Sequence, residues 1–349
     1  MILAIDVGGT KMAAGLVAPD GTVITSRRAA TPQNADAETL WRTLTTLIDP
    51  LSARAEGVGV GCGGPMTWPD GEVSPLNIPG WRDFPLRARL AGRFPGLPVR
   101  LHNDAICLAI AEHWQGAGRG SADMLGMVVS TGVGGGLILG GRLVNGGTGN
   151  AGHIGHVVVE PDGGPRCGCG GHGCLEAVAR GPALTTWALT HGWTPSVGPE
   201  PLAATEGGEA TEGGEASEGG EASEGGEASE GGEAYREDRA VTGRALAADA
   251  RAGDPVAVLA MRRAGRALGI AIASATHLCD LDLVTIGGGL SQAGDPLFDP
   301  LEEALRDHAR MGFARRVKVV PAALGQEAGL VGAAALLLAG GAYWPSTRD

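Results

Sequence analysis

Two segments of the chain have the same arrangement of residues. Residues 2–17, ILAIDVGGTKMAAGLV, and residues 124–141, MLGMVVSTGVGGGLILGG, each contain an apolar run, a glycine-containing loop and a second apolar run. Runs of this kind predict buried strands joined by a turn. Helical patterns alternate with the apolar runs, over residues 39–52, 176–190, 240–251 and 255–279. The sequence therefore predicts an α/β fold with mixed sheets and two similar halves.

The first glycine loop, DVGGTK, has the residues expected of a phosphate-binding turn. Gly8 and Gly9 leave backbone N–H groups free to face phosphate oxygens with no side chain in the way. Thr10 adds a hydroxyl, Lys11 adds a positive charge, and Asp6 adds a carboxylate suited to hydrated Mg²⁺. The spacing is neither a Walker A loop nor a dinucleotide-binding GxGxxG turn. Because glycine turns after strands are common, this loop alone is weak evidence for a nucleotide.

Two further glycine loops strengthen the phosphate interpretation. STGVGGG, residues 130–136, repeats the order of strand, hydroxyl and glycines, and IGGGLS, residues 286–291, is placed to contact a nucleoside. Together the loops predict a nucleotide as a ligand. The candidate contacts in these two loops are Thr131, Gly132, Gly134, Gly287 and Gly288.

Asn103 and Asp104 stand between a predicted strand and a predicted helix. An Asn-Asp pair at this place is a good helix N-cap, and in isolation that structural role is favoured. With phosphate loops in the same chain, a second role becomes the stronger one. Asp104 would accept the proton of an attacking sugar hydroxyl, and Asn103 would hold a neighbouring hydroxyl.

Three cysteines lie within the segment RCGCGGHGCLE, at positions 167, 169 and 174. Six cysteines in 349 residues are too few for a disulfide scaffold, and a disulfide between Cys167 and Cys169 would be strained. A tight cysteine cluster in a reducing compartment predicts a metal site, with a thiol redox site as the weaker alternative.

The formal charge of −12 comes mostly from one repeated segment. The hexamer [TS]EGGEA occurs five times over residues 205–234 and contributes ten glutamates, so the rest of the chain is close to neutral. The repeat has no large apolar residue and predicts a disordered acidic insert, with an interaction tether as the less favoured role. Since composition implies no basic face, nucleic acid is not expected as a partner.

The start of the chain lacks the features of a secretory signal peptide. No uninterrupted apolar stretch is long enough to span a membrane. These observations predict a cytoplasmic protein with no membrane partner.

The motifs DVGGTK, GGP, HNDA, STGVGGG, GHIGH, CGCGGHGCLE, IGGGLS and QEAGLVGAA occur in this order. The chain thereby closely resembles the ROK family of bacterial sugar kinases and sugar-responsive repressors, over about residues 2–338 with the Glu-Gly repeat excluded. The resemblance implies a two-domain hexokinase/actin-like ATPase fold, with ribonuclease H-like halves and a cleft between the domains. It implies a small N-terminal domain over 1–118, a C-terminal helix over about 327–349 that returns to it, and a large zinc-binding domain over 119–326.

The resemblance also implies roles for individual residues. Structural zinc would be held by His156, Cys167, Cys169 and Cys174, and Cys₃His is a closed tetrahedral set. His172, inside the cysteine segment, is the competing fourth ligand. His153 stands where the family usually has Glu, which puts in doubt which sugar is bound. The implied sugar contacts are Gly64, Asn77, Asn103, Asp104, His153, His156 and Glu176.

The resulting expectation is an ATP-dependent hexose kinase, most like a glucokinase, that transfers the γ-phosphoryl group to the sugar 6-hydroxyl and forms a homodimer or homotetramer. Alternative substrates are N-acetylglucosamine, N-acetylmannosamine, mannose and fructose, and polyphosphate is the less favoured donor. A transcriptional repressor is a rival of another class. Such relatives carry a helix-turn-helix domain before the first phosphate loop, which here begins at residue 6.

Overall fold

The computed structural model describes residues 1–196 and 241–343. The predicted acidic insert at 205–234 lies outside the described residues, as do the last six residues of the predicted C-terminal helix. Among the described residues, no helix is both long enough and apolar enough to cross a membrane.

The first half is built on a five-stranded sheet in the order β3–β2–β1–β4–β5. β1 pairs antiparallel with β2 and parallel with β4, because β2 follows through a tight turn while β4 returns after a helical crossover. β1 and β4 are buried and apolar along nearly their whole length, as expected for strands covered on both faces. The strands are β1 (Ile2–Val7), β2 (Lys11–Val17), β3 (Val23–Ala30), β4 (Gly57–Cys62) and β5 (Val99–Asn103).

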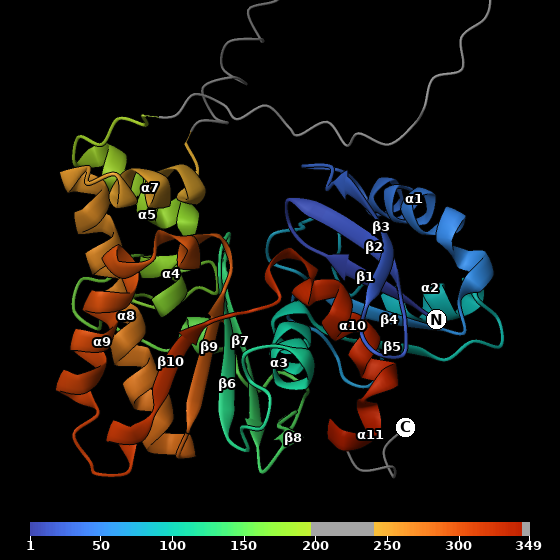
Figure 1. Ribbon diagram of the computed structural model, residues 1–349. Helices are drawn as coiled ribbons and strands as arrows, with labels where there is room; N and C mark the ends of the chain where they lie inside the picture. The colour runs from blue at the N-terminus through green and yellow to red at the C-terminus, as the bar shows by residue number, and fades with distance from the viewer. Residues whose placement is uncertain (197–240, 344–349) are drawn as a thin grey trace, which may run out of the picture.

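The second half repeats this topology in a sheet of order β10–β9–β6–β7–β8. Here β6 pairs antiparallel with β7 and parallel with β9. The predicted α/β fold with two similar halves is therefore confirmed (Figure 1). The strands are β6 (Met124–Val129), β7 (Val133–Leu139), β8 (Arg142–Leu143), β9 (Leu283–Gly287) and β10 (Lys318–Pro321).

Helices cover the outer faces of both sheets. The helix predicted over 255–279 has those bounds, whereas the one predicted over 176–190 is two helices that meet at Arg180, because Pro182 begins a new first turn. The α-helices are α1 (Ala37–Ile48), α2 (Leu86–Arg93), α3 (Asp104–Gln115), α4 (Leu175–Ala179), α5 (Gly181–Thr190), α7 (Gly243–Arg251), α8 (Pro255–Cys279), α9 (Asp295–His308), α10 (Ala328–Leu338) and α11 (Gly340–Tyr343).

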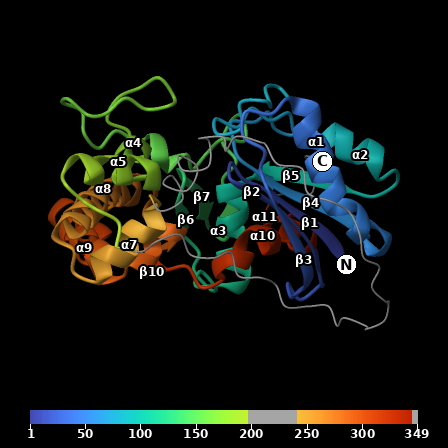
Figure 2. The same ribbon diagram turned by 90° about the horizontal axis from the view of Figure 1, so that it is seen from above.

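α3 and α10 pack against each other between the two sheets (Figures 1 and 2). α10 covers β1 and β4 of the first sheet, and α3 covers β6 and β7 of the second. α3 thus contacts both halves, and the predicted domain boundary near residue 118 stays a prediction.

A buried glutamate joins the two places where the chain crosses between the halves. Glu112, on α3, is 0% exposed and accepts N–H groups from Ala117 at 2.8 Å, Ala323 at 3.0 Å and Leu324 at 2.9 Å. Charge-assisted hydrogen bonds of this kind compensate for the burial of a carboxylate. Glu112 therefore holds both crossing segments in a fixed position against α3.

Candidate active site

A cavity of about 380 Å³ opens between the two halves. A separate hollow of about 430 Å³, against α9 and β10, contains none of the predicted site residues. Of the predicted site residues, the cavity between the halves is lined by Asp6, Gly8, Gly9, Thr10, Lys11, Gly64, Asn77, Asn103, Asp104, Thr131, Gly132, Gly134, His153, His156 and Glu176.

The first glycine loop is the tight turn between β1 and β2. The Gly8 N–H donates to the Lys11 carbonyl at 3.0 Å, which closes the turn. The segment after β3 braces it from outside: the Thr31 hydroxyl donates to the Gly8 carbonyl at 2.7 Å, and the Gln33 amide donates to the Gly9 carbonyl at 2.9 Å. With these carbonyls engaged from outside, the backbone of the turn is held in place at the edge of the cavity.

The second glycine loop connects β6 and β7. The Val133 N–H donates to Oε2 of Glu176 at 2.9 Å, so a residue predicted to contact the sugar also holds a predicted nucleotide loop. Ser130 fixes the other end of the loop, because its carbonyl accepts from the Gly181 N–H at 2.8 Å. Glu176 consequently connects the two predicted parts of the site.

The third glycine loop does not reach this cavity. Gly287 is the last residue of β9, and neither it nor Gly288 lines the cavity. Gly288 has a φ of 96° and lies so close to the Val129 carbonyl that a Cβ would collide with it. In this structure its absence of a side chain is explained by the fold alone, and a nucleoside contact stays a prediction.

Asn103 and Asp104 form the junction of β5 and α3. Asn103 caps the helix, since its Oδ1 accepts from the Ala105 N–H at 3.0 Å and from the Ile106 N–H at 3.4 Å. Asp104 lies at the cavity, and burial raises its pKa against the lowering effect of the Ala105 N–H. The structural role of Asn103 and a catalytic role of Asp104 are therefore compatible.

Asp6 is a second carboxylate at the same cavity. Burial and then the charge of Asp104 raise its pKa from 3.8 to about 7, against the opposing effect of Lys11. Two neighbouring carboxylates in a partly desolvated cleft carry more negative charge than the fold neutralises. A divalent cation held with nucleotide phosphates would relieve this excess, so the residues fit Mg²⁺.

Replacement of Asp6 by asparagine is expected to stabilise the metal-free protein at high pH. Between pH 3.8 and about 7 the folded chain retains a proton that the unfolded chain has released, so stability falls as pH rises through this window. The neutral amide carries no such cost. The free energy of unfolding should therefore rise by roughly 1–3 kcal/mol at pH 8, a gain that is limited because the side chain still contacts water.

Thermal melts of both proteins at pH 4 and pH 8 without Mg²⁺ measure this. The melting-temperature difference should be small at pH 4 and larger at pH 8. A difference independent of pH would contradict the raised pKa of Asp6.

The sugar candidates come from both halves and meet beside Gly64. A Cβ built on Gly64 would lie 3.0 Å from Nδ2 of Asn103, which is a tight contact, and 3.5 Å from Cε1 of His153, which is ordinary van der Waals distance. The Nε2 atom of His153 is buried and has no hydrogen-bond partner among the described residues. Burial, and then the neighbouring His156, lower the pKa of His153, which keeps the ring neutral. A neutral ring nitrogen without a partner can pair with a ligand hydroxyl.

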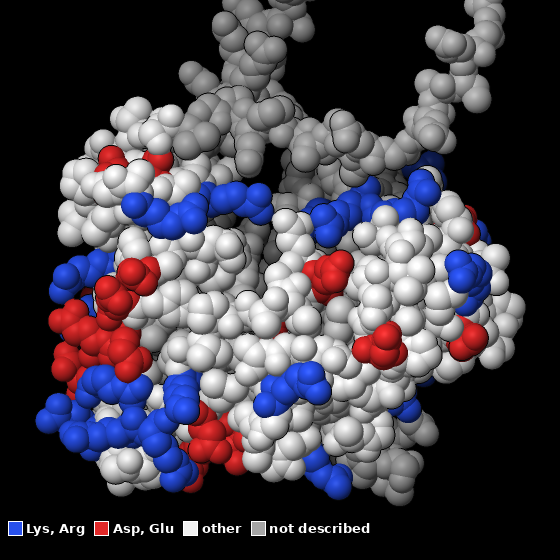
Figure 3. All heavy atoms as spheres, viewed as in Figure 1, with Lys and Arg blue, Asp and Glu red and all other residues white. Residues whose placement is uncertain are grey.

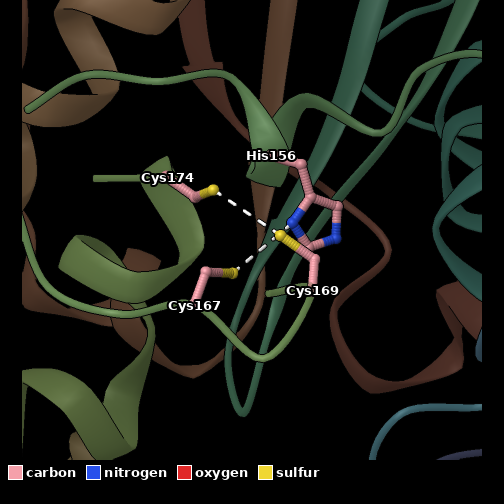
Figure 4. A group of neighbouring side chains, drawn as sticks. All are labelled: His156, Cys167, Cys169 and Cys174. Atoms are coloured by element: carbon pink, nitrogen blue, oxygen red, sulfur yellow. Dashed lines mark hydrogen bonds between the residues drawn. The ribbon is translucent and has the colours of Figure 1, made fainter. Parts of the chain in front are cut away.

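The three cysteines and His156 form a compact donor group, and their ligand atoms all lie within 4.8 Å of one another (Figure 4). Sγ of Cys167 is 3.6 Å from Nδ1 of His156, and Sγ of Cys169 is 3.8 Å from Sγ of Cys174. Tetrahedral zinc with ordinary bond lengths requires separations of about 3.6 and 3.8 Å for such pairs. The donor set fits zinc, and His172 is not part of it.

The cysteines are not paired with one another in disulfides. The Cys169–Cys174 sulfur separation of 3.8 Å is far beyond a disulfide bond. His156 also lines the cavity, so the metal group and the candidate sugar site share one residue.

The cavity includes residues that sequence reasoning did not identify. Arg180 adds a second cation beside the second glycine loop, and Leu76 adds an apolar surface. Arg180 had one usable signal, a basic residue directly before Gly181 and Pro182 at a helix break. The bracing residues Thr31 and Gln33 had none, because only tertiary structure brings them to the first turn.

Comparison with known proteins identifies the family. The ROK family model matches residues 2–339. The chain belongs to the ROK family.

Among its ROK relatives, the glucokinase of Thermotoga maritima is 33% identical over 340 residues, covering 96% of each chain. The N-acetylmannosamine kinase of Escherichia coli O157:H7 is 42% identical over 189 residues, covering 53% of this chain and 63% of that enzyme. Among solved structures, a ROK glucokinase from Streptomyces griseus in complex with glucose and AMPPNP is 32% identical. It superposes with a TM-score of 0.74 and covers 96% of this chain and 98% of that one.

Proposed function

We propose that this ROK protein is an ATP-dependent hexose kinase of the glucokinase type, which transfers the γ-phosphoryl group of ATP to the sugar 6-hydroxyl. The observation that carries the proposal is that one cavity gathers the candidate nucleotide turns, Asp104 and the candidate sugar contacts. Similarity to glucokinases over 96% of the chain supports the same activity. The similar Streptomyces griseus structure, with glucose and AMPPNP bound, supports ATP as the donor.

In the proposed mechanism, Asp104 accepts the proton of the 6-hydroxyl as its oxygen attacks the γ-phosphorus. Its raised pKa makes the carboxylate a stronger base than an exposed aspartate. Mg²⁺ bound with ATP would neutralise phosphate charge near Asp6. Lys11 and Arg180 line the cavity and would stabilise the transferring group, together with those N–H groups of the two glycine turns that do not already donate within the fold as Gly8 and Val133 do. Closure of the halves over the substrates would exclude water that otherwise hydrolyses ATP.

We also propose that the Cys₃His group holds a structural zinc ion. His156 contributes Nδ1 to the donor group and lines the cavity, and Cys174 directly precedes α4, which carries Glu176. Zinc would fix these two sugar-site segments against each other, as supporting interactions around functional sites do.

Replacement of His153 by leucine is expected to raise the KM for the sugar by about 3- to 10-fold, the cost of losing one hydrogen bond to a hydroxyl. The KM for ATP should stay the same, because the proposed contact of His153 is with the sugar. Steady-state kinetics with glucose, 2-deoxyglucose and 1-deoxyglucose measure the effect. The sugar that lacks the contacted hydroxyl should respond least to the substitution, and an equal response from all three would contradict the contact.

A coupled assay with a panel of hexoses tests the proposed function. Glucose, mannose, fructose, N-acetylglucosamine and N-acetylmannosamine are compared with ATP and with polyphosphate as donors. The highest kcat/KM is expected for glucose with ATP. The similarity to an N-acetylmannosamine kinase makes that sugar the alternative substrate. If none of the five sugars is phosphorylated with either donor, the proposal is contradicted.

The proposal includes a cytoplasmic enzyme that assembles as a homodimer or homotetramer and does not bind nucleic acid. On the face shown in Figure 3, Lys and Arg form separate groups along the upper edge of both halves and at the lower left, and most of the Asp and Glu lie between them. Mass measurement by light scattering and a gel-shift assay test the assembly and the absence of DNA binding.

A further inference from the structure

A buried histidine next to the catalytic candidate has no role in the mechanism above. His102 lies on β5, directly before Asn103 and two residues before Asp104, and is 0% exposed. Its ring stacks on Trp68, with centroids 4.7 Å apart and planes inclined by 25°. A polar ring buried this completely must use its two nitrogens in specific hydrogen bonds.

Both ring nitrogens are engaged, and the partners define the tautomer. Nδ1 accepts the backbone N–H of Asn103 at 2.8 Å, so this nitrogen carries no proton. Nε2 therefore carries the proton and donates to Oδ1 of Asn145 at 2.9 Å. Burial lowers the pKa of His102 to about 4, so the ring keeps this neutral form at physiological pH.

Asn145 belongs to the opposite half of the molecule. It lies just after β8, at the start of the segment that leads to His153. The same segment contacts the first half a second time: Nδ2 of Asn150 donates to the Met66 carbonyl at 3.0 Å, and Oδ1 of Asn150 accepts the Met66 N–H at 3.4 Å. The segment that presents His153 is thus docked on the first half at two points.

We propose that His102 is a positioning residue for phosphoryl transfer, which fixes Asn103 and Asp104 through Nδ1 and ties them through Nε2 to the segment that presents His153. The proposal rests on the proposed kinase function. In this role the His102 ring keeps the base, Asp104, aligned with the sugar, although the two are held by different halves of the molecule. Loss of the tie would let the two segments shift independently, and a displacement of about 1 Å can reduce turnover by about 100-fold.

The test uses His102→Asn, Asn145→Ala and the double variant. Asparagine places an amide oxygen near the Nδ1 position, so it can still accept the Asn103 N–H, but it is too short to reach Asn145. Each single variant should raise the sugar KM and lower kcat, with kcat/KM for the sugar reduced about 10- to 100-fold. In the double variant, kcat/KM for the sugar should be little lower than in either single variant, because all three variants lack the same His102–Asn145 interaction.

Two controls separate positioning from general damage. ATP affinity without sugar, measured by calorimetry, should stay within about twofold of the wild type, a change of less than about 0.5 kcal/mol. His308→Asn, an exposed histidine on α9, should behave as the wild type.

The possible results are distinct. An unchanged sugar KM in His102→Asn, additive losses in the double variant, or parallel losses of ATP and sugar affinity would each overturn the positioning role while leaving the kinase function intact. Absence of turnover in the wild type itself would overturn the kinase function and, with it, this inference.

Discussion

Asp104→Asn is expected to lower kcat by about 10²- to 10⁴-fold, the range for loss of a general base. Asparagine has nearly the same shape, and its Oδ1 can still accept the Ala105 N–H that Asp104 accepts at 2.8 Å. It cannot accept a proton. The sugar KM should therefore change far less than kcat, as measured by steady-state kinetics with glucose and ATP. Asp104→Ala should abolish turnover while retaining part of the sugar binding.

The stability of the variant shows whether lost activity reflects lost folding. Because burial raises the pKa of Asp104, its ionised form is unfavourable in the fold, and the neutral amide should not lower the melting temperature at pH 8. Asp162→Asn, at an exposed loop position, serves as the matched control and should keep wild-type kinetics. Full activity of Asp104→Asn would remove this residue from the role of base.

Loss of the Cys₃His group is expected to lower the zinc content, the melting temperature and kcat/KM for the sugar. The purified protein should contain about one zinc ion per chain, and the Cys167→Ser/Cys169→Ser variant should contain little, since two of four ligands are gone. Elemental analysis measures the content directly. The melting temperature should fall. The kcat/KM for the sugar should fall more than ATP affinity, because His156 belongs to the donor group and also lines the part of the cavity that we propose binds the sugar.

Cys279→Ser is the control for this experiment, since Cys279 is a half-buried cysteine at the end of α8 and outside the donor group. It should keep full zinc content. Retention of stoichiometric zinc by the double serine variant, or its absence from the wild type, would contradict the assignment.

The strands and the longest helix were predictable from sequence because their signals are local. β6 is a continuous apolar run, β1 is apolar except for Asp6, and both lead into glycine loops. α8 begins at Pro255, directly after Asp254, whose side chain caps it. α9 was not predicted. Pro300 falls in its interior, where proline normally argues against a helix, whereas Pro296 lies in its first turn, where proline is tolerated. β10 is only four residues long, too short for a periodic pattern.

The site was predictable where residue type and spacing carry the chemistry. The cysteine spacing indicated a metal group, and the glycine loops indicated anion-binding turns, most of which the structure brings to one cavity. The proposed zinc ligand His156 and the proposed sugar contacts came from the family resemblance. The roles of Thr31, Glu112 and the His102–Asn145 pair arise from contacts between segments 23 to more than 200 residues apart, which no local pattern reveals.

Phosphorus NMR of the products formed from ATP and glucose tests the central claim most directly. The account predicts glucose 6-phosphate and ADP in equal amounts, and it predicts that 6-deoxyglucose binds as a competitive inhibitor without being phosphorylated. Formation of inorganic phosphate alone, or of a sugar phosphate substituted at another hydroxyl, would contradict the placement of the sugar 6-hydroxyl between Asp104 and the γ-phosphoryl group.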